Sequence, residues 1–173
     1  MEYKILEKMF EGTKPTSVFE FGCANGGLLK DLAKAYPGLT VGGADMNLPD
    51  IEKARQNFPE YAHNFILHNV SDKLPIDDYS YDYVFGVGIF MYLLNPQLAL
   101  EEAIRICRKG VVLAEFHNED LGELGGLLRV EWPPGKFHLA VIRNYEKLFA
   151  TIGKKATVKH SGIDKHIIYY EKH

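Results

Sequence analysis

The sequence predicts an α/β fold with a doubly wound, mostly parallel sheet, and three observations lead to this class. Apolar runs typical of buried strands alternate with amphipathic helical patterns over most of the chain. A glycine-rich turn, at residues 22–27, joins the first strand directly to a helix. The chain then finishes on two strand-like runs, 156–160 and 166–171, separated by a short turn. A closing hairpin of this kind makes the last strand antiparallel.

Each expected element follows from a local pattern. The alternating strands are expected at residues 18–21, 39–44, 64–68, 84–87 and 111–116. Helices are expected over residues 1–14, 28–36, 49–58, 96–109 and 145–152. Pro49 and Pro96 stand where a helix begins, and Gly12, Gly110 and Gly153 stand where one ends.

Composition restricts the class of protein further. With 173 residues, 46% of them hydrophobic, the chain is long enough for one domain with a full core. A net charge of −3 gives no electrostatic reason to expect nucleic acid. No apolar run approaches the length of a membrane span, and the start has no basic leader, so we expect a cytoplasmic protein. The two cysteines have no metal-ligand spacing and suggest reduced thiols.

The spacing of the glycine-rich turn indicates the kind of ligand. A dinucleotide motif requires glycine at the first, third and sixth positions, which here are Gly22, Ala24 and Gly27. The Ala24 methyl group stands where a pyrophosphate would approach the backbone. Glu20, Gly22 and Gly26 instead form the pattern acid-x-Gly-x-x-x-Gly, which resembles motif I of the class I S-adenosylmethionine-dependent methyltransferases. Such turns also serve for packing alone, so the turn by itself leaves both interpretations open.

A carboxylate at the end of the second strand supports an adenosine-containing ligand. Asp45 is placed to accept hydrogen bonds from both ribose hydroxyls, although Asp in this position also serves as a turn or N-cap residue. The resemblance implies that Met46 packs on the adenine face, while ordinary core filling is the alternative. It also places Asn69 and Val70 at the adenine edge, with Ser71 or Asp72 as alternatives because one residue appears inserted there.

The block SYDYVFGVGIFMYL, residues 80–93, resembles the fourth-strand motif of the same family and implies that backbone groups near Val87 and Gly88 meet the methionine end of the cofactor. With this block, the resemblance covers residues 18–170. It implies a three-layer α/β/α fold with a seven-stranded sheet and S-adenosylmethionine as the cofactor. The predicted cofactor contacts are Glu20, Phe21, Gly22, Cys23, Ala24, Gly26, Asp45, Met46, Asn69, Val70, Val87 and Gly88.

Three residues are candidates for the catalytic group. His117 directly follows the fifth strand, at the edge where ligands bind in such sheets, and it is the first candidate for a general base. A solvated loop histidine is the alternative. Tyr92 and His138 are further candidates after His117, and for Tyr92 taken alone a core aromatic is the commoner role. No residue cluster has metal-ligand spacing, so we expect a metal-independent reaction.

The acceptor side of the predicted site is the insertion at residues 117–142, where Gly125 and Gly126 precede an aromatic and basic cluster around Trp132. We expect this insertion to form a substrate lid within a single domain, residues 1–173, whose short N-terminal helix, residues 1–14, leaves the cofactor site open. Either the site stays unusually open, or a second copy, a partner chain or another domain completes it, and a minimal enzyme is the simpler alternative. The alternative is that the insertion only covers an apolar edge.

The reaction expected is methyl transfer to the oxygen or nitrogen of a small polar acceptor. The runs VLAEFHN and GVGIFMYL also resemble methylases associated with bacterial surface-sugar pathways, which suggests a sugar acceptor. Two other classes stay open: a binding or scaffold protein that keeps the fold without catalysis, and a nicotinamide oxidoreductase. Ala24 and the lack of chain for a substrate domain argue against the oxidoreductase.

Overall fold

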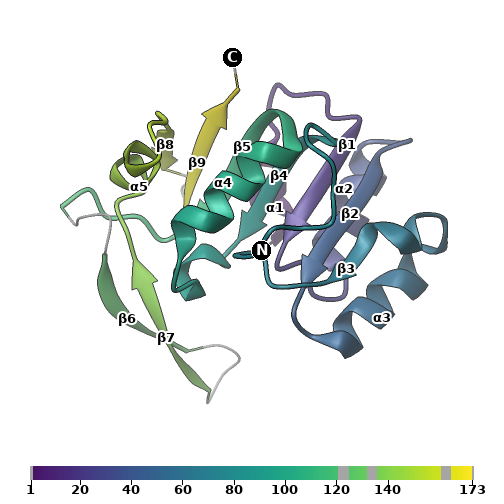
Figure 1. Cartoon of the computed structure of the whole chain (residues 1–173), viewed down its shortest axis with the longest axis horizontal. Coiled ribbons are helices and arrows are strands. Elements are labelled where there is room, and N and C mark those ends of the chain that lie inside the picture. Colours follow the sequence, from purple (N-terminus) through teal and green to yellow (C-terminus); the bar gives the residue numbers. More distant parts are fainter. Residues whose placement is uncertain (1, 121–124, 132–135, 161–164, 173) are drawn as a thin grey trace.

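The computed structural model shows a seven-stranded sheet between two helical layers, and it describes residues 2–120, 125–131, 136–160 and 165–172 (Figure 1). The strand order is β3-β2-β1-β4-β5-β9-β8, and only β9 runs antiparallel to the rest. The expected fold class is therefore confirmed. The strands are β1 (Ser17–Phe21), β2 (Thr40–Asp45), β3 (Phe65–Leu67), β4 (Tyr81–Val87), β5 (Cys107–Glu115), β8 (Thr157–His160) and β9 (His166–Glu171).

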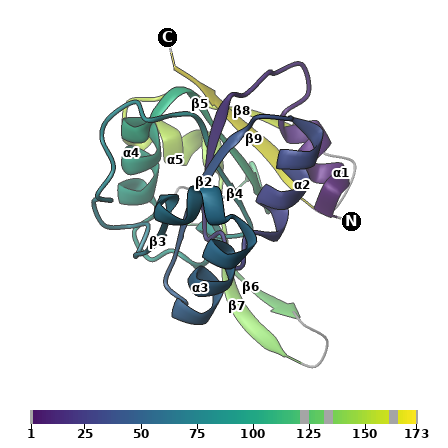
Figure 2. The ribbon, with the colours of Figure 1, turned by 90° about the vertical axis from the view of Figure 1, so that its right-hand side faces the viewer.

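Two hydrophobic cores fix the helices on opposite faces of the sheet (Figure 2). The helices are α1 (Glu2–Met9), α2 (Gly27–Ala35), α3 (Leu48–Asn57), α4 (Pro96–Ile106) and α5 (Tyr145–Thr151). Apolar residues of α1, α2 and α3 form one core, and those of α4 and α5 form the other. Two 3-10 turns complete this set, η1 (Pro59–Asn64) and η2 (Phe90–Tyr92). In the part of the chain that the structure describes, no helix is both long and apolar enough to cross a bilayer.

The parallel strands bring their carboxyl ends to one edge of the sheet, which we call the rim. It is formed by the ends of β2, β1, β4 and β5, at Asp45, Phe21, Val87 and Glu115. The loops that follow these strands therefore meet, although they lie far apart in the sequence. In Figure 1 the rim is the lower edge of the sheet, on the side where α3 begins.

The boundary between α4 and β5 differs from the expected one. The helix ends at Ile106 rather than at residue 109, and the strand begins at Cys107 rather than at residue 111. The cause is a buried carboxylate, Asp82 on β4, which binds Arg108 Nε at 3.1 Å and Lys109 Nζ at 2.9 Å. Tertiary ion pairs thus draw two residues with good helix propensity into the strand.

Two further segments depart from expectation. Helix α1 ends at Met9 rather than at residue 14, and Gly12, with a φ of +75°, has a conformation that an α-helix cannot include. The insertion at residues 117–142 contains an antiparallel hairpin, β6 (Gly126–Glu131) and β7 (Phe137–Ile142), which extends from the rim side of the sheet (Figure 1). The sequence analysis predicted no strands there. Trp132 and the three residues after it lie outside the described residues.

Candidate cofactor and methyl-transfer site

The glycine-rich turn adopts the left-handed conformations that its composition suggests. Gly22 and Gly26 have φ values of +69° and +76°, and Ala24 between them has a φ of +44°. A left-handed conformation is unfavourable for alanine, and such backbone is found most often at functional sites. The N–H groups of Gly22 and Cys23 both donate to Ala44 O, at 2.8 and 3.1 Å, so the turn is anchored on β2.

Asp45 lies directly against this turn. Its Oδ2 accepts the Ala24 N–H at 2.9 Å, and its Oδ1 accepts the Asn47 N–H at 2.9 Å. Each carboxylate oxygen keeps a further lone pair, so both can still accept hydrogen bonds from a ligand hydroxyl. Ala24 is exposed and Asp45 is half-buried, so the position is open to a ligand. Met46 beside it is 72% exposed, so its side chain is accessible to a ligand.

Three of the predicted contacts around the glycine-rich turn have buried side chains. Glu20, Phe21 and Cys23 are each at most 3% exposed. Burial, together with the Glu20 and Asp45 carboxylates, raises the pKa of the Cys23 thiol, so this group stays protonated. The Cys23 side chain fills the space where a Cβ on Gly43 would stand, which explains the glycine in β2. The cysteine thus acts in packing beneath the turn, and a ligand would meet its backbone.

The predicted adenine edge lies beside Asp45. The His68 N–H donates to Asp45 O at 2.9 Å and so joins the end of β3 to the end of β2. The Asn69 side-chain oxygen accepts the Ser71 N–H at 3.0 Å, which fixes a tight turn. Val70 is only 4% exposed and packs into the core, so it offers a ligand its backbone alone.

The end of β4 reaches the other side of the turn. The Gly88 N–H donates to Ala114 O at 2.9 Å, and Gly88 has a φ of +66°. Ile89 then crosses over the turn, because its side chain lies 2.9 Å from the position of a Cβ on Gly22. Val87 and Gly88 are half-buried, so this part of the rim remains accessible.

The two predicted catalytic residues lie at the β5 side of the rim. Tyr92 is on η2 and is 43% exposed, and burial and the Glu115 charge raise the pKa of its hydroxyl. His117 Nδ1 accepts the Tyr145 N–H at 3.2 Å. Burial and the neighbouring His166 ring, 5.4 Å away, lower the pKa of His117. The neutral ring therefore carries its proton on Nε2 and presents a donor to its surroundings, so in this arrangement His117 does not offer the free nitrogen that the predicted general base would need.

The sequence analysis missed four residues near η2: Glu115, Arg143, Tyr145 and Lys165. Glu115 was detectable as the lone acid within the apolar run VVLAEF, since such a residue is buried only with partners. The other three follow the insertion, and only the folded chain brings them here. Lys165 Nζ lies 2.5 Å from the position of a Cβ on Gly88. Among the described residues, no three His, Cys, Asp or Glu side chains form a group that could hold a metal ion.

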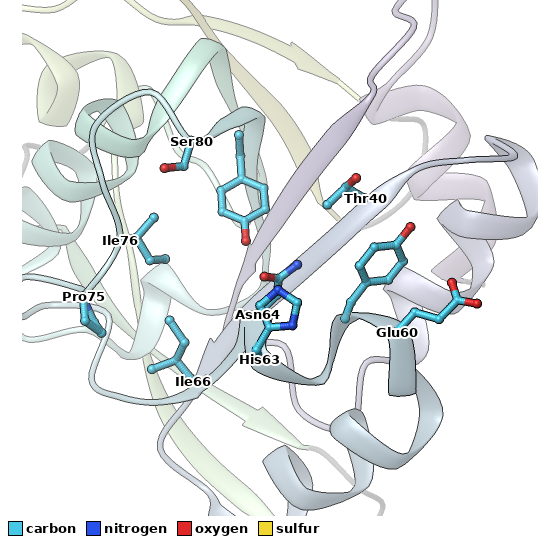
Figure 3. A pocket seen from close by; sticks show the side chains of 10 residues that line it. Thr40, Glu60, His63, Asn64, Ile66, Pro75, Ile76 and Ser80 are labelled. Carbon is cyan, nitrogen blue, oxygen red and sulfur yellow. The ribbon is translucent and has the colours of Figure 1, made fainter.

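A cavity of about 540 Å³ lies elsewhere, near the amino ends of β2, β3 and β4 (Figure 3). Thr40, Asn64 and Ser80 mark these strand starts along its wall. The cavity is therefore at the edge of the sheet opposite the rim, and it shares no residue with the predicted cofactor contacts.

The fold and the turn define a class, an S-adenosylmethionine-dependent methyltransferase of class I, and comparison with known proteins agrees. The family model of the methyltransferase domain matches residues 19–114, more than half of the chain, so the chain belongs to this family. Its cofactor is S-adenosylmethionine. The comparison with curated proteins finds no match.

Solved structures show the same fold. An S-adenosylmethionine-dependent methyltransferase from Aquifex aeolicus has a TM-score of 0.71 and 19% identity, over 98% of this chain and 88% of that one. A protein from Pyrococcus horikoshii OT3 has a TM-score of 0.71 and 17% identity, over 98% and 86%. A complex of the Haloferax volcanii Trm112 methyltransferase activator with a putative methyltransferase matches with a TM-score of 0.55 and 24% identity, over 68% of this chain and 54% of that one. The chain thus spans about half the length of this last relative.

Proposed function

We propose that the chain transfers the methyl group of S-adenosylmethionine to the oxygen or nitrogen of a small polar acceptor, without a metal ion. The observation that carries this proposal is the carboxylate of Asp45, which lies on the glycine-rich turn at an accessible point of the rim. In doubly wound sheets, an acidic residue at a strand end can bind the ribose hydroxyls, and a glycine-rich turn lets the rest of the ligand approach the backbone. S-adenosylmethionine supplies an already activated methyl group.

In this proposal the chain's residues bind the cofactor along the rim. Asp45 accepts the ribose hydroxyls, Met46 covers the adenine, and Asn69 with the Val70 backbone meets the adenine edge. The methionine end then lies near Gly88. From β2 to β5 the rim crosses three strand spacings, about 14 Å. An extended nucleoside with an amino-acid tail fits along this length of the rim. With the adenosine at the β2 end, the acceptor would bind at the β5 end.

Catalysis in this proposal comes mainly from positioning. Holding the acceptor in line with the methyl group can supply about 7–11 kcal/mol in favourable cases. Tyr92 and His117 are the candidates for contact with the acceptor. Since His117 Nδ1 is engaged by the Tyr145 N–H, the Nε2–H group is the part of this ring that can orient an acceptor oxygen. The insertion at residues 117–142 would act as the substrate lid.

A second chain is also part of the proposal. On the rim, Ala24 and Met46 are exposed and Asp45 is half-buried, so the described residues leave this part of the site accessible to a second chain. The archaeal relative, which was solved in complex with an activator, is a precedent for a partner on this fold. The cytoplasmic location expected from the sequence stays a prediction, and so does the single domain over residues 1–173.

The test is a transfer assay with S-adenosylmethionine labelled in its methyl group, in the presence of a metal chelator. A panel of small sugars, amines and phenols serves as acceptors, and calorimetry measures the affinity for S-adenosylhomocysteine in parallel. We expect binding of the product and transfer of label to at least one acceptor. Absence of binding would remove the proposed function, and binding without any transfer would favour a scaffold protein that keeps the fold.

His117 can be tested once an acceptor is known. We expect His117→Ala to lower turnover about tenfold, because the variant loses a donor at the acceptor side while positioning by the rest of the site continues. The affinity for S-adenosylhomocysteine should change less than twofold, an estimate of about 0.4 kcal/mol. The matched control is His63→Ala, which removes an exposed histidine at the opposite edge. Equal turnover of both variants would exclude a catalytic role for His117.

A further inference from the structure

The short turn η2 is held by side chains from two different segments. Glu115, the last residue of β5, is fully buried, and its Oε1 accepts the N–H groups of Ile89 and Phe90 at 2.8 and 2.9 Å. Arg143, which follows β7 and is 4% exposed, donates to Phe90 O at 2.8 Å and to Leu93 O at 2.9 Å. A buried carboxyl group therefore accepts the N–H groups at the start of η2, and a buried guanidinium donates to carbonyl groups at its start and just after its end.

These contacts are costly to build, which makes a purely structural explanation weak. Burying a carboxylate and a guanidinium costs more than burying an apolar pair of similar volume. Tyr145, also fully buried, lies close to both groups: burial and the Glu115 carboxylate raise the pKa of its hydroxyl, and Arg143 lowers it. Glu115, Arg143 and Tyr145 thus occupy buried positions that apolar side chains could fill at a lower cost.

What η2 touches suggests what the contacts are for. The Ile89 side chain packs over Gly22 of the cofactor turn and over Gly86 of β4. The Phe90 ring stacks on Phe21, the residue before that turn, with an interplanar angle of 2° and a centroid distance of 6.4 Å. A shift of η2 would therefore displace the Ile89 and Phe90 side chains, and with them the cofactor turn on which they pack.

We propose that Glu115 and Arg143 are positioning residues, a clamp that holds η2 against the cofactor turn and so sets the affinity for the methionine end of the cofactor. The effect on cofactor affinity rests on the proposed function, whereas the clamp itself is a property of the free protein. Neither residue reaches the turn directly, and both act through Ile89 and Phe90.

The clamp responds to pH near neutrality. Burial raises the pKa of Glu115 to about 7, although Lys165 and the N–H groups of Phe90 and Ile89 lower it. The charged and titratable groups that face it are Lys165, Arg143, Tyr145 and Tyr92. As long as Glu115 stays buried, its ionised form accepts stronger hydrogen bonds than its protonated form, so local opening of η2 is rarer at pH 8 than at pH 6, even though ionisation of the buried carboxyl lowers the stability of the whole fold.

Amide hydrogen exchange of the free protein tests the clamp. We expect the Ile89 and Phe90 amides to be better protected at pH 8 than at pH 6, after correction for the intrinsic exchange rates. In Glu115→Gln, an isosteric variant, both amides should exchange about tenfold faster at pH 8 than in the parent, with no dependence of protection on pH. Equal protection in parent and variant would overturn the clamp.

The matched control is Glu102→Gln. Glu102 on α4 is also a buried carboxylate that accepts a backbone N–H, from Leu74 at 2.7 Å, and pairs with Arg105. This variant should leave the protection of Ile89 and Phe90 unchanged. A similar loss there would mean that removing any buried carboxylate loosens the chain, and it would contradict a specific clamp.

Calorimetry with S-adenosylhomocysteine tests the consequence. Glu115→Gln should bind S-adenosylhomocysteine about tenfold more weakly than the parent at pH 8. Arg143→Lys retains the charge but lacks the planar guanidinium, so its affinity should lie between those of Glu115→Gln and the parent. Faster exchange with unchanged affinity would overturn the positioning role. If the parent itself binds no S-adenosylhomocysteine, the proposed function fails, while the exchange experiment still decides the clamp.

Discussion

The Asp45→Ala variant is expected to bind S-adenosylhomocysteine about 5- to 150-fold more weakly than the parent, a loss of about 1–3 kcal/mol. The reason is that the variant removes the acceptors proposed for both ribose hydroxyls. It also frees the N–H groups of Ala24 and Asn47, which Asp45 holds at 2.9 Å. Both groups lie at an exposed part of the chain where water can replace the carboxylate, so the fold should persist.

Two companion variants make the Asp45 result specific. Asp50→Ala removes a nearby carboxylate from the first turn of α3 and should leave the affinity within about twofold, because Asp50 points to Asn47 rather than to the turn. Asp45→Asn retains one acceptor oxygen and should lie between Asp45→Ala and the parent. Calorimetry measures all three. If Asp45→Ala binds as tightly as the parent, the ribose is not at this carboxylate.

The second large effect concerns the stability of the fold across neutral pH. Burial raises the pKa of Glu115 from its ordinary 4.5 to about 7. Between these two pH values the folded chain keeps the Glu115 proton, whereas the unfolded chain has lost it. This contribution to stability is complete below pH 4.5 and disappears as the pH rises through 7. The shift corresponds to about 3 kcal/mol. Glu115→Gln cannot titrate, so its free energy of unfolding should lack this decrease.

The measurement is the free energy of unfolding of parent and variant in urea, at intervals from about pH 5 to about pH 8. His117 and His166 have lowered pKa values, so they make stability rise with pH over part of the same range. Both proteins share these histidines, and the difference between the two curves isolates Glu115. We expect this difference to move in favour of the variant as the pH rises. Parallel curves would show that Glu115 titrates normally in the folded chain.

The cofactor half of the fold is predictable because its signals are local. Strand β1, the turn after it and Asp45 are each encoded within a few residues, through apolar runs, left-handed glycines and a carboxylate at a strand end. The antiparallel position of β9 also follows from a local pattern, two short strands joined by a short turn. Here the local preferences and the final fold agree.

The other half depends on contacts between distant residues. The start of β5 at Cys107 requires Asp82 to draw Arg108 and Lys109 into the strand, which no pattern near them shows. In the same way, the role of Glu115 becomes visible only when η2 and Arg143 are placed beside it. The β6–β7 hairpin escaped detection because its glycines and prolines indicated a loop.

The most direct test of the central claim is an amide chemical-shift titration of the chain with S-adenosylhomocysteine. The account predicts the largest shifts at Gly22–Gly26, Asp45, Met46 and Gly88, all on the rim. Amides of Thr40, Asn64 and Ser80, which line the cavity at the opposite edge in Figure 3, should stay in place. Shifts confined to that cavity, or no shifts at all, would contradict a cofactor held between the turn and Asp45.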